Sequence, residues 1–427
     1  MNSRERISAV LNHEPADKVA VDLGGMACSG AHVSVVSKLR DILGLNKGRL
    51  HRVKVWDPYQ MLGEIELDLI EALQLDIVLV PGLKNIFGFE NKDWKPWKLF
   101  DGTEVLVPGK FNTQSENNGD IFQYPQGDRS APPSGRMPCG GYYFDTIIRQ
   151  SPIEESQLDP KDNLEEFKLI SDEDLKYLEK QVDYYYRNTD LAIAIGIPGA
   201  AFGDIALVPA PFLKYPKGIR DIEEWYISTI TRKNYIKDVF LGQCEIALEN
   251  IKKIFQALGS KVQIVTMDAT DLASQDSLFC SPENYKEMYL PFAKKLNDWI
   301  HEHTKWKTVK HCCGACEPLI GCFIEAGYDI LNPIQCSAKG MDPKMLIEKY
   351  GREIVFWGGG VDTQKTLAFG TPDEVKDEVT RRADIFNKEN GFIFNTIHNI
   401  QSGTPIENII AMFKAIWQFN SNFFKKV

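Results

Sequence analysis

The chain has 427 residues, of which 43% are hydrophobic and 25% are charged, so it can bury a large core. Its formal net charge of -10 argues against nucleic acid as the main partner, because phosphate binding needs a clustered positive field. No apolar run approaches the ~20 residues that cross a bilayer, and the first residues lack the apolar core of a secretion signal, so we expect a cytoplasmic protein whose nine cysteines are reduced.

Eight short apolar segments rich in branched residues predict buried parallel strands. They cover residues 18–25, 75–82, 191–199, 262–269, 307–314, 328–335, 354–362 and 391–399. Helical patterns lie between the later segments, and alternating strands and helices indicate a parallel sheet. We therefore predict a single (β/α)8, or TIM, barrel over residues 1–427. An open doubly wound sheet is the alternative, but the glycine-rich stretches at 24–30 and 357–362 do not match its GxGxxG turn.

Between residues 85 and 151 the alternation of strands and helices is lost. The segments "WKPWKLFDGTEVLVPGKF" and "GGYYFDTIIRQ" predict antiparallel strands around turns. A long loop rich in proline and glycine, residues 124–141, lies between them. We predict that residues 85–151 form a β-rich lobe inserted into the barrel.

Polar residues follow six of the eight predicted strands, where a barrel places its active site. They are Asp22, Asp268, Asp271, His311, Cys313, Asn332, Gln335, Asp362, Asn395, His398 and Asn399. The ordinary polarity of loops would explain part of this pattern. Its recurrence nevertheless predicts a polar pocket at one mouth of the barrel.

The stretch "VKHCCGACEPLIGC", residues 309–322, contains one histidine and four cysteines. Side chains at i and i+2 of a strand point to the same side, so His311 and Cys313 are expected to lie together. Imidazole and thiolate are ligands that zinc prefers, and a catalytic zinc usually has three protein ligands. His398, at the end of the last strand, is our predicted third ligand, with Cys316 as an alternative.

The other cysteines carry no metal-ligand spacing and are interpreted as small buried hydrophobic residues. They are Cys28, Cys139, Cys244, Cys280 and Cys336, while Cys322 fits an apolar helical face. Corrinoid-binding proteins use a D-x-H-x-x-G motif, but Val309 stands here in the aspartate position. We therefore expect that the chain does not hold a corrinoid permanently.

The chain resembles the uroporphyrinogen decarboxylase superfamily and, within it, the zinc-dependent methyltransferases that work with corrinoids in anaerobic metabolism. The resemblance rests on "RERISAVLNHEPADKVAVDLGG", "IEAGYDILNPIQ", "VFWGGGVDTQ", "FGTPDEVKDEV" and "TPIENIIAMFKAI". True decarboxylases of this superfamily carry an arginine-rich N-terminal segment, whereas this chain has "VDLGGMACSGAHVS". The methyltransferases carry H-x-C-G, which matches the run from His311 to Gly314. Their third ligand is usually a cysteine, which His398 would replace here.

The resemblance implies transfer of a methyl group between a small O-, N- or S-methylated substrate and the corrinoid (cobalamin) of a partner protein. The implied site would hold Zn²⁺ on His311, Cys313 and His398. Asp271 would supply a proton or orient the substrate. Gln275, Gln335 and Asp362 would contact the substrate or orient neighbouring groups.

Two alternatives remain at this stage: a metal-free decarboxylase or lyase, and a non-catalytic partner of a corrinoid protein. With two imidazoles and one thiolate, demethylation of the substrate is favoured over transfer onto a thiol. Cobalt or iron could occupy the same ligands. The sequence leaves open the methyl donor and whether the chain forms a homo-oligomer.

Overall fold

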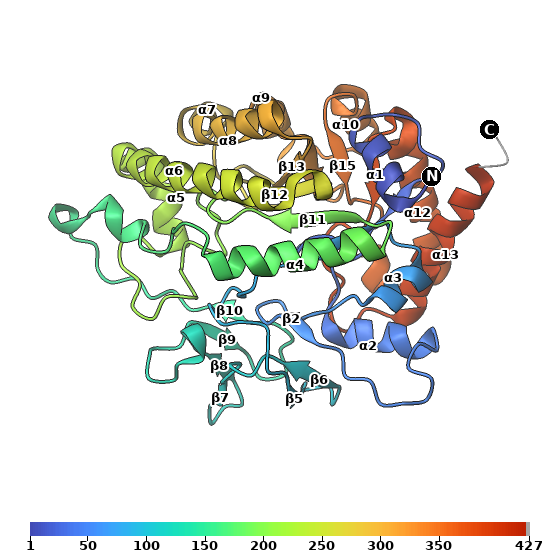
Figure 1. Cartoon of the computed structure of the whole chain (residues 1–427), viewed down its shortest axis with the longest axis horizontal. Coiled ribbons are helices and arrows are strands. Elements are labelled where there is room, and N and C mark those ends of the chain that lie inside the picture. Colours follow the sequence, from blue (N-terminus) through green and yellow to red (C-terminus); the bar gives the residue numbers. More distant parts are fainter. Residues whose placement is uncertain (424–427) are drawn as a thin grey trace.

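A computed structural model describes residues 1–423 of the chain, and its largest sheet has eight strands. The sheet is parallel, in the order β1-β16-β15-β14-β13-β12-β11-β4 (Figure 1). The strands are β1 Ala20–Val21, β4 Ile77–Val80, β11 Ala192–Gly196, β12 Ile264–Asp268, β13 Lys307–His311, β14 Ile330–Asn332, β15 Val355–Trp357 and β16 Phe392–Phe394. Each lies within one of the eight predicted segments, and the (β/α)8 prediction is confirmed.

Helices surround this sheet (Figure 1). They are α1 Ser3–Leu11, α2 Val33–Ile42, α3 Leu67–Leu73, α4 Asp172–Asn188, α5 Ile222–Thr231, α6 Lys233–Leu258, α7 Pro282–Met288, α8 Leu290–His303, α9 Glu317–Glu325, α10 Pro343–Tyr350, α11 Thr366–Phe369, α12 Pro372–Phe386 and α13 Ile406–Phe423. None of these described helices is both long enough and apolar enough to cross a membrane. The α12 helix shows the expected start, since Thr371 caps it, Pro372 is its first residue, and Thr371 and Glu374 form a capping box.

The barrel interior is filled by side chains that alternate along the strands, as expected for a packed core. One cluster joins Ile77, Ala192, Ala194, Ile264, Val309, Ile330, Val355 and Ile393, all almost fully buried. The same cluster includes Ile7, Val10 and Leu11 of α1. The first helix therefore packs against the interior of the barrel, and its apolar face is buried there.

Asp76 joins the two ends of the sheet, β1 and β4. Its backbone N–H donates to the carbonyl of Val21 at 2.8 Å, and its carboxylate accepts from the N–H of Val21 at 2.8 Å. The same carboxylate accepts from Ser3 at 2.7 Å and from Arg6 at 2.5 Å. Because Asp76 is only 1% exposed, these bonds form away from water and close the barrel at its N-terminal face.

Six short strands between residues 95 and 146 lie outside the barrel sheet, on one side of it (Figure 1). β5 Lys95–Lys98 and β6 Glu104–Val107 form an antiparallel pair. β7 Gln114–Ser115, β8 Ile121–Gln123, β9 Gly135–Met137 and β10 Asp145–Thr146 form a second antiparallel sheet. Before them, β2 Val55–Asp57 pairs with β3 Leu62–Gly63, a hairpin that the sequence analysis did not predict.

Replacing Asp76 by alanine should lower the free energy of unfolding by roughly 3–5 kcal/mol, because it leaves Arg6 without a buried partner and removes the side-chain hydrogen bond between β1 and β4. The matched control is Asp17→Ala, which removes the other carboxylate on Arg6 but is 22% exposed at its side chain. This control should cost about 1 kcal/mol. Urea unfolding followed by tryptophan fluorescence measures both, and equal losses would contradict a special role for Asp76.

Candidate active site at the barrel mouth

His311 ends strand β13 with its ring orientation fixed by Asn332, the last residue of β14. Its Nδ1 lies 2.7 Å from Asn332 Oδ1, while the amide nitrogen of Asn332 donates to the carbonyl of Trp357 at 3.0 Å. That second bond identifies Oδ1 as the acceptor, so Nδ1 of His311 carries the proton. Nε2 therefore carries the lone pair, and it accepts a hydrogen bond from the thiol of Cys313 at 3.4 Å.

Cys313 and Asp271 complete this side of the mouth. The N–H of Cys313 donates to Asp271 Oδ1 at 2.6 Å, and the same oxygen is 3.8 Å from Nε2 of His311. The hydroxyl of Tyr226 donates to the main-chain carbonyl of Asp271. Gly314 follows with φ +88°, where a Cβ would lie 2.4 Å from the carbonyl oxygen of Ser274. The turn that presents Cys313 therefore requires glycine at position 314.

His398 and Cys28 approach from the loops after the last and the first strand. The rings of His311 and His398 are 5.5 Å apart at their centroids. Asn399 fixes the two loops together, because its amide nitrogen donates to the carbonyl of Ala27 at 2.9 Å and its oxygen accepts from Gly30 at 2.6 Å. Cys28 is thus positioned by the residue that follows His398.

Two groups of potential metal ligands occur among the described residues, with ligand atoms within 4.8 Å of one another in each. One is Cys28, His311 and His398, and the other is Asp271, His311 and Cys313. The predicted set of His311, Cys313 and His398 is spread over both groups, with His311 common to them. Around one zinc ion, neighbouring ligand atoms lie roughly 3.5 Å apart, so the 3.4 Å between His311 and Cys313 suits a shared ion.

The chemistry of these donors fits a divalent cation. Within the described part of the chain, the ring nitrogens of His398 make no hydrogen bond, and the thiol of Cys28 makes none either. Burial lowers the pKa of His311 and lowers that of His398 to about 4, so both imidazoles are neutral and able to bind metal. Burial, with a contribution from the Asp271 carboxylate, raises the pKa of Cys28 and Cys313 well above the ordinary thiol value. Metal binding would therefore release protons.

Three further predicted residues bind the protein's own backbone or lie at the rim. Gln335 accepts from the N–H of Gly314 at 2.7 Å, and Asp362 accepts from the N–H groups of Gln364 and Lys365. Gln275 is exposed, with its amide 3.5 Å from that of Gln364. Cys316, the alternative third ligand, is buried, and its thiol donates a hydrogen bond to the carbonyl of Cys312. It belongs to neither group of potential ligands.

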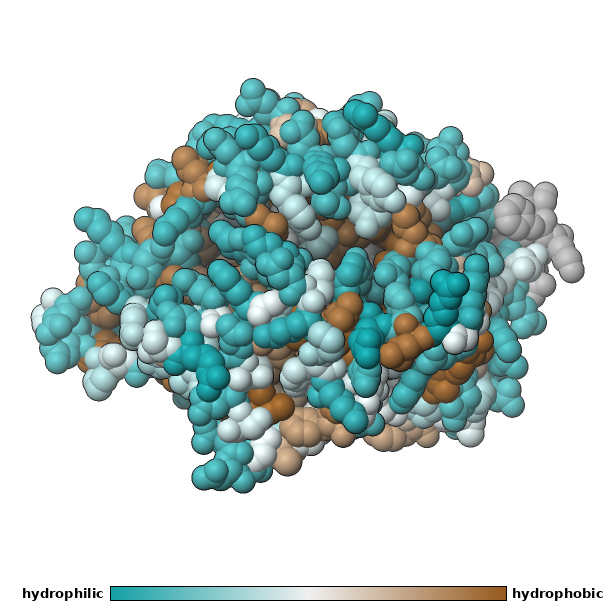
Figure 2. Space-filling model, turned by 60° about the horizontal axis from the view of Figure 1, so that its bottom comes forward, coloured by the Kyte–Doolittle hydropathy of each residue, from teal (hydrophilic) through white to brown (hydrophobic). Residues whose placement is uncertain are grey.

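A cavity of about 820 Å³ opens beside these donors. Cys28, Asp271, His311 and His398 line its floor, and lobe residues such as Asn85, Asn91 and Thr146 line its wall. The lobe thus covers part of the barrel mouth. The surface seen from the lobe side is mainly hydrophilic, with apolar residues in small separate groups (Figure 2).

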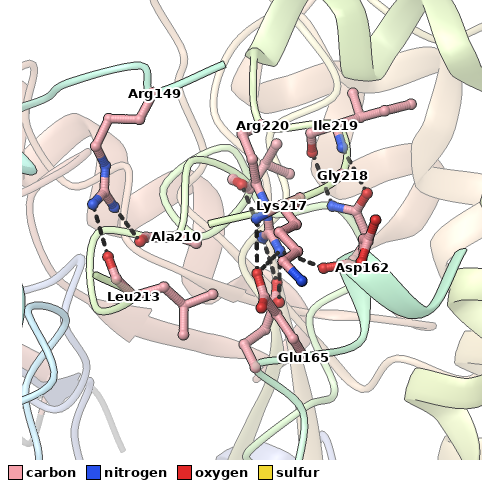
Figure 3. A network of polar contacts seen from close by, with 12 residues as sticks. Arg149, Asp162, Glu165, Ala210, Leu213, Lys217, Gly218, Ile219 and Arg220 are labelled. Atoms are coloured by element: carbon pink, nitrogen blue, oxygen red, sulfur yellow. Dashed lines mark hydrogen bonds and ion pairs between the residues drawn. The ribbon is translucent and has the colours of Figure 1, made fainter. Parts of the chain in front are cut away.

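The connection after β11 supplies a further wall of the cavity, including Asp204, Leu207 and Phe212. Two arginines hold it in place (Figure 3). Arg149 donates to the carbonyls of Ala210 and Leu213, both at 2.7 Å. Arg220, which is fully buried, binds both carboxylate oxygens of Glu166, at 2.8 and 3.0 Å. The wall is therefore supported by charge-assisted bonds rather than left as a loose loop.

Cys28 is the main feature that sequence reasoning missed. The glycine-rich run around it indicates a tight turn, but no spacing connects it with residues near 311 or 398. Only the closure of the barrel brings the first and last loops together. Knowledge of the closed sheet would have identified Cys28 as a residue of the mouth.

Comparisons with known proteins agree with this architecture. A sequence model of the family described as uroporphyrinogen decarboxylase (URO-D) matches residues 205–419. A solved structure titled "methyltransferase from Methanosarcina mazei" is similar, with a TM-score of 0.55 and 16% identity over 98% of this chain and 99% of that chain. At this identity the likeness concerns the fold alone. A search of curated proteins found no match.

If a metal binds at this site, replacing Asn332 by alanine should weaken the binding of added Zn²⁺ about 10–100-fold, because His311 loses the acceptor that fixes its tautomer. Competition with a chromophoric chelator measures the affinity. Asn297→Ala is the matched control, since Asn297 is a fully buried asparagine on α8 that donates to the carbonyl of Ala326. An equal loss of affinity in both variants would refute the positioning role of Asn332.

Asp204 should make a contribution to the stability of the protein that falls as the pH rises from about 4 to 7. Burial raises the pKa of Asp204 to about 7, against about 3.9 in an unfolded chain, so the folded state binds more protons across this window. Its contribution to stability is complete below pH ~4 and lost above pH ~7. Asp204→Asn should reduce the decline by about 2–4 kcal/mol, measured by urea unfolding at several pH values. An unchanged pH profile would contradict this assignment.

Proposed function

Because the chain belongs to the uroporphyrinogen decarboxylase family, we propose that it is a zinc-dependent methyltransferase acting with a corrinoid protein. The methyl group would pass from a small methylated substrate to the corrinoid of that partner. One observation carries the proposal: two imidazoles, two thiols and a carboxylate meet at the barrel mouth, and all of them except the thiol of Cys313 line a cavity there.

His311, Cys313 and His398 would hold the metal, with Cys28 close enough to serve as a further ligand. When bound, Zn²⁺ would act as a Lewis acid toward the heteroatom that carries the methyl group. Addition of Cys28 would give two thiolates and two imidazoles. The site would then have two thiolates, as in the methyltransferases whose third ligand is a cysteine in place of His398.

Asp271 would act on the substrate from beside the metal ligands. One of its carboxylate oxygens is held by the N–H of Cys313, and the residue lines the cavity. Its position allows it to accept a hydrogen bond from the substrate or to pass a proton to the heteroatom after the methyl group leaves. Tyr226, which holds the main-chain carbonyl of Asp271, would fix its position.

The cavity favours this reaction over decarboxylation of a porphyrinogen. None of the described residues that line it is an arginine, and its only lysine is Lys84. Four aspartates line it instead, Asp57, Asp145, Asp204 and Asp271. A substrate with many carboxylates would be repelled here, because carboxylates are bound through arginine and lysine.

The corrinoid would reach the mouth on a separate chain. Val309, which stands where a corrinoid-binding motif has its aspartate, packs in the interior cluster of the barrel. His311, the corresponding histidine, is bound on one side by Asn332 and faces Cys313 on the other. These contacts support transient presentation of the corrinoid rather than permanent binding by this chain.

Protein purified without chelators should contain about one zinc per chain, as expected for a catalytic site of this type. The His311→Ala, Cys313→Ala and His398→Ala variants should lose most of that metal and the ability to demethylate test substrates in the presence of reduced cobalamin. Elemental analysis and the change in the cobalamin spectrum measure the two properties.

The control variant is Cys336→Ala, which removes a partly buried cysteine that belongs to neither ligand group. It should retain both metal and activity. Metal-free wild-type protein would refute the proposal and favour the decarboxylase-like alternative. If the Cys313→Ala variant loses the metal and the His398→Ala variant retains it, we would assign the third ligand position to Cys28.

A further inference from the structure

The charges that line the cavity are unbalanced. Four carboxylates face it, and Lys84, its one lysine, is exposed at the rim. Asp57 and Asp204 are 8% and 7% exposed, so water screens them only weakly. A divalent ion at the proposed metal site would compensate Asp271, which lies next to it. Asp57 and Asp204 belong to neither group of potential ligands, so neither would be in direct contact with that ion.

Asp204 shows this imbalance most clearly. One of its oxygens accepts from the N–H of Ala206 at 2.9 Å, while the other has no hydrogen-bond donor among the described residues. The nearest buried cation, Lys310, is already engaged by Asp268 at 2.9 Å and by the carbonyl of Thr270 at 2.7 Å. Burial and the carboxylates of Asp268 and Asp271 raise the pKa of Asp204 to about 7. Its ionised form therefore needs a positive partner that the protein itself does not supply.

Aromatic side chains line the same cavity. Trp56 and Tyr59 come from the β2–β3 hairpin region, and Phe212 comes from the connection that the two arginines support. Trp56 directly precedes Asp57, which accepts from the N–H of Tyr59 at 2.9 Å. Aromatic faces attract cations, and a quaternary ammonium group is typically bound by aromatic rings together with carboxylates.

We propose that this cavity contains a cation subsite, and that the substrate bears an ammonium group in addition to its methylated heteroatom. The ammonium group, quaternary or protonated, would lie against Asp204 and Asp57 and the rings of Trp56, Tyr59 and Phe212. The methylated oxygen or sulfur would lie at the floor near His311. The position of the methylated heteroatom rests on the proposed function, whereas the cation subsite is inferred from the cavity alone.

The two ends have separate chemical requirements. A heteroatom that binds a metal needs a lone pair, which a quaternary or protonated nitrogen lacks. The ammonium group therefore cannot be the atom at the metal, and a cavity of about 820 Å³ has room for both ends of a small substrate. The substrate class that fits is an amine that also carries a methyl ether or methyl thioether.

Choline and its uncharged isostere 3,3-dimethylbutan-1-ol test the subsite, because they have nearly the same shape and differ in charge. Isothermal titration of the metal-containing protein at a pH above 8 should show choline binding at least about tenfold more tightly than the isostere. Asp204→Asn should weaken choline binding by about tenfold and leave the binding of the isostere unchanged. Asp276→Asn, at an exposed carboxylate outside the cavity, is the control and should change neither.

Equal binding of the two compounds by the wild-type protein, or no binding of choline at about 10 mM, would overturn the inference. This comparison needs no variant, so a folding defect in Asp204→Asn cannot obscure it. Metal content is measured on the same sample. Metal present without a preference for choline refutes the subsite alone, whereas a preference for choline in metal-free protein refutes the proposed function alone.

Discussion

The carboxylate of Asp76 joins β1 and β4 at the one place where the described sheet lacks a strand ladder. Everything at the opposite face depends on that closure, because the mouth is assembled from loops that follow different strands. A parallel barrel gives each strand only a short hydrogen-bonded segment, and β1 has two residues. At the N-terminal face, the buried ion pair between Asp76 and Arg6 therefore helps to hold the two edges of the sheet together.

Several polar residues at the mouth make hydrogen bonds that fix neighbouring parts of the protein. Asn332, Gln335, Asp362 and Asn399 each bind a neighbouring loop or ring. This leaves a small set of side chains, centred on His311, with atoms free to bind a metal. A buried polar atom without a hydrogen-bond partner lowers the stability of the protein unless a ligand binds it. The neighbouring polar residues therefore fix the position of such an atom before the ligand arrives.

The sequence predicted the eight strands and their order of appearance, because these follow from local apolar runs. It also predicted that His311 and Cys313 lie together, although β13 ends at His311 and the turn after the strand, rather than the period of the strand, places Cys313 beside it. It could not predict the position of Cys28, which is separated from His311 by 283 residues and from His398 by 370. Nor could it predict the β2–β3 hairpin, whose strands have three and two residues. The roles of Gln335 and Asp362 as backbone acceptors depend on turn geometry. A residue type alone does not reveal that geometry.

The tie between Ala27, Gly30 and Asn399 also has a consequence for how the protein is made. During synthesis the residues near 28 leave the ribosome long before those near 398. The ligand set is therefore incomplete until the last strand has been made. Until then two thiols and an imidazole are held in separate, unfinished segments. Metal uptake by the complete set of ligands would thus report that the whole barrel has folded, and a truncated chain would remain without it.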